Sequence, residues 1–225
     1  MKKHSRFAII FLFSISFFCG RAIAVLAHSI SLSSKSSATI VIDPGHGGND
    51  PGKVSESGLL EKDINLEIAL HLEKLLKNKG YNVILTRDQD KELASDKSQD
   101  LSKRVKLMSD KDVDLVVSIH QNSFSSPESC GPQVFYYTNS KEGSKLATCI
   151  SNTINSSLEI EKPREIQENS DYYILKNSSK PTIIVECGFL SNPKEAELLS
   201  DSSYQQKLAR AIYFGIVSYF NQQMS

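Results

Sequence analysis

A run of three β-branched residues, IVI at 40–42, is followed at once by the glycine-rich sequence DPGHGG. A β-branched run that ends at proline and glycine predicts a buried strand leading into a tight loop. His46 lies in the middle of this loop, and Glu61 follows at the start of a helical pattern. Because ligands of open α/β sheets bind beyond the carboxyl ends of the strands, this stretch predicts a functional site.

Strand and helix patterns alternate along the rest of the chain. Apolar runs predict strands at 40–42, 81–86, 114–120, 134–138 and 182–186. Helical spacing predicts helices at 61–79, 101–108, 141–158, 192–199 and 204–220, with a polar loop at 89–100 and another polar stretch at 162–170. This alternation predicts a single-domain α/β fold with an open, mainly parallel, twisted sheet flanked by helices.

The amino-terminal residues have the composition of a targeting segment. Lysine, histidine and arginine at positions 2–6 precede an apolar stretch at 8–19 and then small residues suited to cleavage. We therefore predict a signal peptide at 1–27, with a retained membrane anchor as the alternative. Residues 28–38 are serine-rich and predict a linker, which leaves 39–223 for the folded domain.

Charge and cysteine content narrow the possible partners. The 26 basic and 26 acidic residues balance, which argues against a nucleic-acid partner. Beyond the predicted signal peptide the cysteines are Cys130, Cys149 and Cys187, so at most one disulfide can form. Cys187 is expected to be a small buried residue, whereas a bridge between Cys130 and Cys149 remains open. The sequence also leaves the oligomeric state open.

Three apolar runs lead to residues that could bind a metal ion or transfer a proton, namely His46, His120 and Glu186. Parallel strands place their carboxyl ends at one edge of a sheet, and Glu61 at the start of the following helix can reach the same edge. Two histidines and one glutamate form the ligand set of several catalytic zinc sites, in which the metal lowers the pKa of bound water to about 7. A second carboxylate nearby would act as general base and acid.

Each of these residues also has an ordinary explanation. A single histidine after a glycine loop is more often a hydrogen-bonding residue than a ligand, and Glu61 would also suit the first turn of a helix. Glu186 is harder to explain structurally, because an unpaired charge in an apolar run is costly. Nucleotide binding by the glycine loop has little support, since the loop lacks both GK[ST] and G-x-G-x-x-G.

Several segments resemble the zinc-dependent N-acetylmuramoyl-L-alanine amidases, the family called Amidase_3. They are IVIDPGHGGNDPG, GLLEKDINLEIALHLEKLL, VILTRDQD, LVVSIHQNS and PTIIVECGFLSNPKEAELL, in the order of the family. The resemblance implies that His46, Glu61 and His120 bind Zn²⁺ and that Glu186 is the catalytic glutamate. Gln121 departs from the family pattern, in which a small residue is more usual.

The resemblance also implies a reaction and a setting. The family hydrolyses the amide between the lactyl group of N-acetylmuramic acid and L-alanine of the stem peptide, by zinc-activated water with Glu186 passing the proton to the alanine nitrogen. A lone catalytic domain behind a signal peptide is similar to the germination-specific amidases of endospore formers. Those act on peptidoglycan of the spore cortex during sporulation, where stem removal precedes muramic-δ-lactam formation.

This setting implies an exported protein acting in the cell wall, in the forespore intermembrane space, with the amino terminus as an alternative anchor. An exported accessory or activating protein is expected as a partner because no wall-binding module is present. Two other functions use the same residues or the same fold. One is a zinc peptidase that cuts within the stem peptide, and the other is an inactive wall-binding or partner-binding protein.

Overall fold

The computed structural model describes residues 37–223. The predicted signal peptide or anchor at 1–27, and the predicted linker as far as residue 36, lie outside the described residues. A compact unit starts at Ala38. Within the described part of the chain, no helix has both the length and the apolar character needed to cross a membrane.

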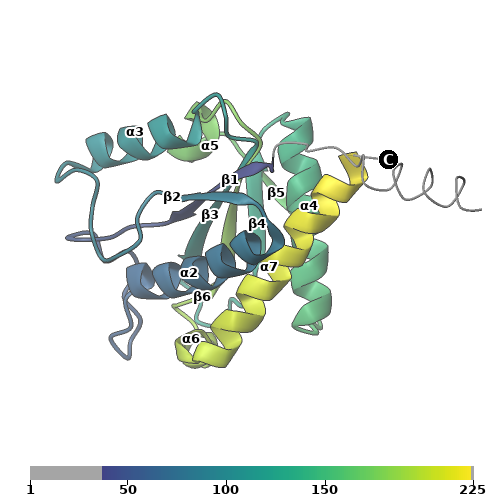
Figure 1. The fold of residues 1–225 in the computed structure, drawn as a ribbon. Coiled ribbons are helices and arrows are strands. Elements are labelled where there is room, and N and C mark those ends of the chain that lie inside the picture. The colour runs from purple at the N-terminus through teal and green to yellow at the C-terminus, as the bar shows by residue number, and fades with distance from the viewer. Residues whose placement is uncertain (1–36, 224–225) are drawn as a thin grey trace, which may run out of the picture. The chain divides into compact units, whose positions relative to one another are not determined.

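A six-stranded sheet forms the centre of this unit (Figure 1). From one edge to the other its strands are β2 (Asn82–Leu85), β1 (Thr39–Pro44), β3 (Leu115–Asn122), β6 (Thr182–Phe189), β4 (Gln133–Tyr137) and β5 (Gln167–Asn169). Every neighbouring pair is parallel except β4 and β6, which are antiparallel. The predicted mainly parallel α/β sheet is therefore confirmed.

Helices cover both faces of the sheet. One face carries α2 (Glu61–Lys79), α4 (Lys141–Ser157), α6 (Pro193–Ser200) and α7 (Ser202–Gln223). The other carries α3 (Lys97–Met108) and the short α5 (Tyr173–Asn177), which lie together in Figure 1. The smaller cover on the second face leaves room for a groove along that side.

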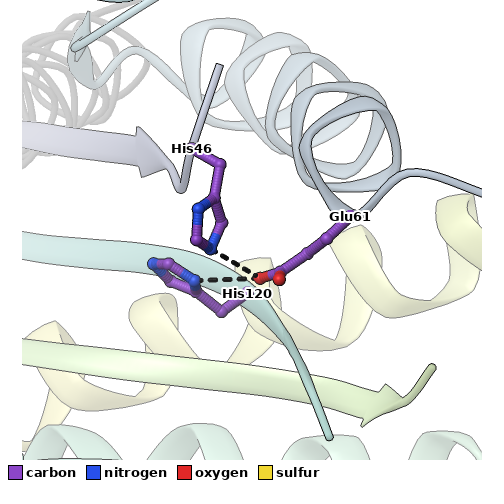
Figure 2. A group of neighbouring side chains, drawn as sticks. All are labelled: His46, Glu61 and His120. Atoms are coloured by element: carbon purple, nitrogen blue, oxygen red, sulfur yellow. Dashed lines mark hydrogen bonds and ion pairs between the residues drawn. The ribbon is translucent and has the colours of Figure 1, made fainter. Parts of the chain in front are cut away.

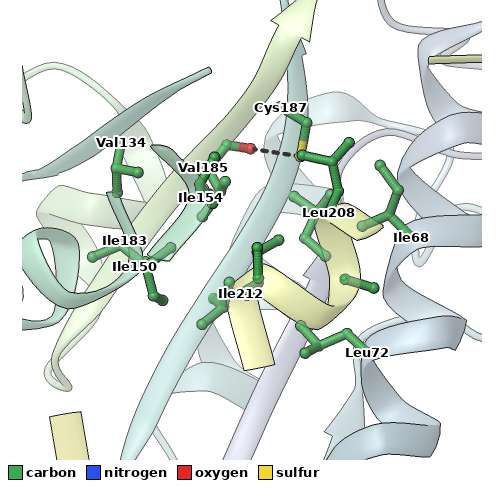
Figure 3. Packing of buried hydrophobic residues seen from close by; sticks show 14 of the residues in the cluster. Ile68, Leu72, Val134, Ile150, Ile154, Ile183, Val185, Cys187, Leu208 and Ile212 are labelled. Carbon is green, nitrogen blue, oxygen red and sulfur yellow. Dashed lines mark hydrogen bonds between the residues drawn. The ribbon is translucent and has the colours of Figure 1, made fainter. Parts of the chain in front are cut away.

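The two faces of the sheet follow from the two-residue period of the strands. On β6, Ile183, Val185 and Cys187 join the large apolar cluster with α2, α4 and α7, part of which is shown in Figure 3. Ile184 belongs to the smaller cluster with α3 and α5. Glu186 has the same parity as Ile184, so the alternation directs its side chain to the α3–α5 face.

The strands that carry His120 and Glu186 extend further than the apolar runs indicate. The sequence predicts that both runs stop at these residues, but β3 continues to Asn122 and β6 to Phe189. The ladder between them persists through a register irregularity after His120. Polar residues are tolerated there because the backbone is still paired, so His120 and Glu186 lie within strands and not at their ends.

Two further differences from the prediction, at α3 and β5, have a clear physical cause. α3 begins at Lys97, because the Asp96 side chain accepts a hydrogen bond from the Gln99 amide and caps a polar first turn that carries no apolar periodicity. Gln167–Asn169 forms the edge strand β5 beside β4. Backbone pairing alone places it there, since its side chains are mostly exposed.

The three cysteines within residues 37–223 are free thiols. Cys187 is buried, as predicted, and lies in the large apolar cluster. Cys149 is buried on α4 while Cys130 is exposed, so the bridge that the sequence left open between them is not formed.

Candidate metal centre

Three of the residues singled out in the sequence meet near the carboxyl ends of the central strands (Figure 2). His46 lies in the loop after β1, Glu61 is the first residue of α2, and His120 lies near the end of β3. Their ligand atoms all lie within 4.8 Å of one another. Residues separated by up to 74 positions therefore form one compact cluster, as the parallel arrangement of β1 and β3 requires.

The glutamate lies between the two histidines. Its Oε1 is 3.0 Å from Nδ1 of His120 and 3.3 Å from Nε2 of His46. The two imidazole rings meet edge to face with centroids 5.1 Å apart. Glu61 is only 4% exposed, so the cluster has one buried carboxylate and two inward-facing nitrogens. This donor set suits a divalent metal ion such as zinc.

Two glycines allow the ligands to approach so closely. A Cβ on Gly45 would lie 2.2 Å from Cε1 and 2.3 Å from Nε2 of the His120 ring. A Cβ on Gly52, whose φ is +66°, would lie 2.6 Å from Oε2 of Glu61 and 2.7 Å from Cδ2 of His46. Any larger residue at either position would displace a ligand side chain.

Hydrogen bonds behind the ligands fix their orientation. Nδ1 of His46 is 2.9 Å from Oδ2 of Asp50, which leaves Nε2 directed at Glu61. A carboxylate behind a histidine is the usual way to set the tautomer of a metal ligand. Asp50 comes only four residues after His46, and this spacing is the signal by which sequence reasoning could have found it.

A second set of donors holds Glu61. The Lys53 amide donates to its Oε2 at 2.8 Å, and the Gln121 amide donates to its Oε1 at 3.0 Å. The side chain of Asn65 donates to the same Oε1 at 3.3 Å, and the side chain of Gln121 donates to Asn65 Oδ1 at 3.0 Å. Gln121, the departure from the family pattern, thus supports Asn65 and does not obstruct His120.

These contacts shift the ionisation of the ligands. Burial opposes the charge on Glu61, but the hydrogen bonds from His120 and His46 outweigh it and hold the pKa of Glu61 far below its usual range. Burial likewise opposes the charge on His120, yet the contact with Glu61 raises the pKa of this histidine overall. Glu61 is therefore an anion at neutral pH, and a bound cation would replace the histidine protons around it.

Glu186 lies beside this cluster and not within it. It is the register partner of His120 across the β3–β6 ladder, it is 8% exposed, and its Oε2 is buried with no hydrogen-bond partner among the described residues. Burial raises the pKa of Glu186 to about 7, despite the opposing effect of His120. An orphaned carboxylate that changes ionisation near neutral pH is suited to proton transfer.

The cluster opens into a groove of about 330 Å³ on the α3–α5 face. His46, His120 and Glu186 reach this groove, and Tyr172, Tyr173 and Leu101 form much of its apolar wall. Lys97 at its mouth is highly exposed, with a long contact of 3.6 Å to Asp50. These wall residues carry no local sequence signal, because a short apolar piece such as 172–175 has no pattern that separates a groove wall from an ordinary surface.

Fold and site together define a class of protein. It is an α/β domain in which a His–Glu–His cluster suited to a metal ion and a buried free carboxylate share one groove. The family model described as N-acetylmuramoyl-L-alanine amidase matches residues 40–218. The chain belongs to this family, Amidase_3, and its enzymatic class is that of a peptidoglycan amidase.

Individual relatives agree with this assignment. The germination-specific N-acetylmuramoyl-L-alanine amidase of Bacillus subtilis is 40% identical over 203 residues, which cover 87% of this chain and 84% of the relative. The amidase AmiA of Escherichia coli is 29% identical over 81% of this chain and 76% of the relative. Among solved structures, the CwlD amidase from Clostridioides difficile in complex with the GerS lipoprotein is 37% identical with a TM-score of 0.79, covering 82% of this chain and 99% of that one.

Proposed function

We propose that this chain uses a zinc ion held by His46, Glu61 and His120 to hydrolyse the amide between the lactyl group of N-acetylmuramic acid and L-alanine of the stem peptide. One observation carries this proposal: three inward-facing ligand atoms lie within 4.8 Å of one another beside the unpartnered Oε2 of Glu186. When bound, zinc supplies a water molecule of lowered pKa and stabilises charge on the attacked carbonyl.

Glu186 carries the proton in this proposal. It accepts a proton from the attacking water, whose oxygen forms the new bond to the lactyl carbonyl carbon, and delivers that proton to the amide nitrogen as the C–N bond breaks. The stem peptide then leaves with the amine of its L-alanine free, and the lactyl group remains as a carboxylic acid. Burial, which raises the pKa of Glu186 to about 7, suits a group that must both accept and release a proton near neutral pH.

The biological setting follows from the relatives and from the amino-terminal sequence. Because a relative is a germination-specific amidase, we infer action on peptidoglycan of the spore cortex during sporulation, before muramic-δ-lactam formation. Residues 1–27 serve as a signal peptide or retained anchor, 28–38 as a linker and 39–223 as the catalytic domain. The site of action is then extracytoplasmic, in the forespore intermembrane space.

An exported accessory protein is part of the same proposal. A structural neighbour of this chain was solved as a complex with a lipoprotein. If a partner assists this chain, the purified protein should digest cortex peptidoglycan more slowly than an extract of sporulating cells that contains the same amount of it. Equal rates at equal concentrations would contradict the need for a partner.

The reaction is tested by mass spectrometry of the products from purified peptidoglycan. The wild-type protein with zinc is compared with Glu186→Gln, and with Glu161→Gln as a control on an exposed residue. We expect stem peptides with a free L-alanine amine and peptide-free glycan from the wild type and the control. We expect activity of Glu186→Gln to fall by about 10²–10⁴-fold while zinc stays bound.

Other products would contradict specific parts of the proposal. Shortened stems that remain attached to sugar would identify a peptidase acting within the stem. Full activity of zinc-loaded Glu186→Gln would remove the proton-transfer role of this residue. No activity in the wild type, even with the extract added, would favour a binding protein that has kept the fold.

A further inference from the structure

Two buried arginines outside the proposed ligand set surround the loop that carries His46. Arg87 follows β2 and is 1% exposed, and Arg104 lies on α3 and is 2% exposed. Neither residue lies in the ligand cluster, and they come from elements on opposite sides of the loop. Their common target is the backbone of Pro44, Gly45 and His46.

Arg104 holds this backbone at two points with one guanidinium. Its Nη1 donates to the Pro44 carbonyl at 2.8 Å, and its Nη2 donates to the His46 carbonyl at 2.6 Å. The same group is anchored by two carboxylates, with Nη1 2.8 Å from Oδ1 of Asp43 and Nε 2.6 Å from Oδ2 of Asp100. A planar guanidinium can meet four acceptors in this fixed arrangement, whereas a lysine ammonium cannot.

Arg87 connects the same loop to the helix that begins with Glu61. It donates from Nε to the Pro44 carbonyl at 3.0 Å and from Nη2 to the Gly45 carbonyl at 2.9 Å. That Nη2 also donates to the Lys62 carbonyl at 2.7 Å, directly after Glu61. The fourth bond, from Nη1 to Gln89, fixes the guanidinium itself. Arg87 therefore joins the backbones that carry two of the three ligands.

Burying two neighbouring arginines costs free energy, so their hold on this backbone geometry calls for a structural role. All four hydrogen bonds of Arg87 go to backbone carbonyls, and burial next to Arg104 lowers the pKa of Arg87 to about 10. A buried cation whose hydrogen bonds all go to neutral carbonyls is costly, even though Asp43, Asp63 and Asp90 attract its charge. In addition, His46 has a φ of 62°, which a residue other than glycine adopts only when its surroundings enforce it.

We propose that Arg87 and Arg104 are positioning residues for the metal site. They hold the strained backbone at His46 so that its Nε2 faces Glu61 and His120 before a metal ion arrives. This inference rests on the proposed role of these three residues as ligands. A site that is ordered in advance binds its metal more tightly, because less conformational freedom is lost on binding.

The test uses Arg104→Lys and Arg87→Lys in the full chain, with Arg210→Lys on the exposed side of α7 as the matched control. Zinc affinity is measured by competition with a chromophoric chelator, and amide hydrogen exchange is measured on the metal-free protein. We expect each buried-arginine variant to bind zinc about 10–100-fold more weakly, as for other residues that support metal ligands. The control should match the wild type.

Hydrogen exchange separates positioning from general stability. The Gly45 amide donates to the Ile119 carbonyl, and the Gly47 amide donates to the Asp50 carbonyl. In the two variants these amides should exchange faster while those of β6 stay protected. Variants with intact β6 protection and wild-type zinc affinity would overturn the inference. A wild-type chain that binds no zinc would instead overturn the ligand assignment, while loop exchange would still report on the arginines.

A milder variant covers the case in which the lysine variants do not fold. Asp100→Asn removes the negative charge of one anchor of Arg104 at the lining of the groove and leaves both arginines in place. We expect it to fold and to bind zinc several-fold more weakly. Unchanged affinity together with unchanged exchange of Gly45 and Gly47 would contradict the positioning role.

Discussion

The register of β6 decides whether the side chain of Glu186 faces the groove or the apolar cluster. Its neighbours Val185 and Cys187 are fully buried in the apolar cluster, whereas Glu186 faces the groove. A shift of one residue in the pairing of β6 would exchange these environments. In this register Glu186 is the ladder partner of His120, so the carboxylate lies beside the ligands without joining them.

The metal-free protein should show the burial of Glu186 in its pH dependence. Burial raises the pKa of Glu186 to about 7, so the folded state keeps a proton that the unfolded state releases at lower pH. This stabilisation is fully present below pH ~4.3, the usual pKa of a glutamate, and is lost as the pH rises to about 7. Relative to Glu186→Gln, the wild type should lose ~3 kcal/mol of unfolding free energy across this window.

Urea unfolding in the presence of a chelator, at several pH values between 4 and 8, measures this difference. Glu161→Gln serves as the control, because the side chain at position 161 is exposed. A constant difference between wild type and Glu186→Gln over the whole range would mean that Glu186 titrates normally.

β1 and the loop after it position both His46 and Gly45, the residue against which the His120 ring packs. The Gly45 amide bonds to the Ile119 carbonyl on β3, and the missing side chain of Gly45 leaves the space that the His120 ring fills. The loop after β1 and the end of β3 are therefore one structural unit, although 74 residues separate the two histidines. A change in the loop should act on the ligand in the other strand.

Gly45→Ala should weaken zinc binding by at least about tenfold. The new Cβ would lie within 2.6 Å of three atoms of the His120 ring, so the imidazole must move away from Glu61. The control is Gly58→Ala, which strains a turn with a φ of 87° but brings the added Cβ within 4 Å of no other group. Zinc competition on both variants checks this prediction, and equal affinities would show that His120 can shift without loss.

α3 and α5 form the wall of the groove on the face of the sheet that α2, α4, α6 and α7 do not cover. Tyr172, just before α5, is held by an edge-to-face contact with Phe135 at 5.4 Å and keeps 38% of its surface exposed. A rigid, partly exposed aromatic ring at the mouth of a groove offers contact area at little cost in conformational entropy. We therefore expect it to contact the substrate.

Tyr172→Ala should lower kcat/KM on peptidoglycan fragments by about tenfold, equivalent to ~1.4 kcal/mol, mainly through a higher KM. Tyr172→Phe keeps the ring and should stay within about threefold of the wild type. Steady-state kinetics with soluble fragments and unchanged zinc content provide the measurement. A loss in Tyr172→Phe as large as in Tyr172→Ala would assign the effect to the hydroxyl group and not to ring contact.

The helical layer behind the sheet supports the whole molecule without touching the groove. α4 and α7 pack closely because Gly215 lets the backbone of Ile150 approach, and Thr153 donates a hydrogen bond to the Ala211 carbonyl at 2.8 Å. A Cβ on Gly215 would lie 2.6 Å from Cα of Ile150, and backbone cannot yield as a flexible side chain can. Stability and catalysis should therefore separate at this position.

Gly215→Val should destabilise the fold by about 1–3 kcal/mol and lower Tm by several degrees. Activity per folded molecule at 25 °C should remain close to that of the wild type, because α4 and α7 lie on the face opposite the groove. Phe214→Ala, at an exposed neighbouring position, is the control. Thermal unfolding with parallel activity assays checks both parts, and an unchanged Tm would show that the helices can separate freely.

Much of this molecule follows from local sequence patterns. The bounds of α2 were predicted as they are, because a carboxylate opens the helix and Gly80, with a φ of 95°, ends it. His46, His120 and Glu186 were singled out from apolar runs that lead to polar residues, and Glu61 from its place at the start of a helical pattern. The edge strand β5 and the first turn of α3 escaped prediction, because backbone pairing and one capping aspartate define them and neither produces periodicity.

The α/β class, the family and the four candidate site residues could all be predicted from the sequence, since each depends on short-range order along the chain. The tertiary structure was needed to show that Oε2 of Glu186 is buried beside the ligands without a partner, and that Arg87 and Arg104 hold the backbone of the His46 loop. These contacts join residues 42 and 58 positions apart in the chain. Such contacts depend on strand register and helix placement, which no local pattern encodes.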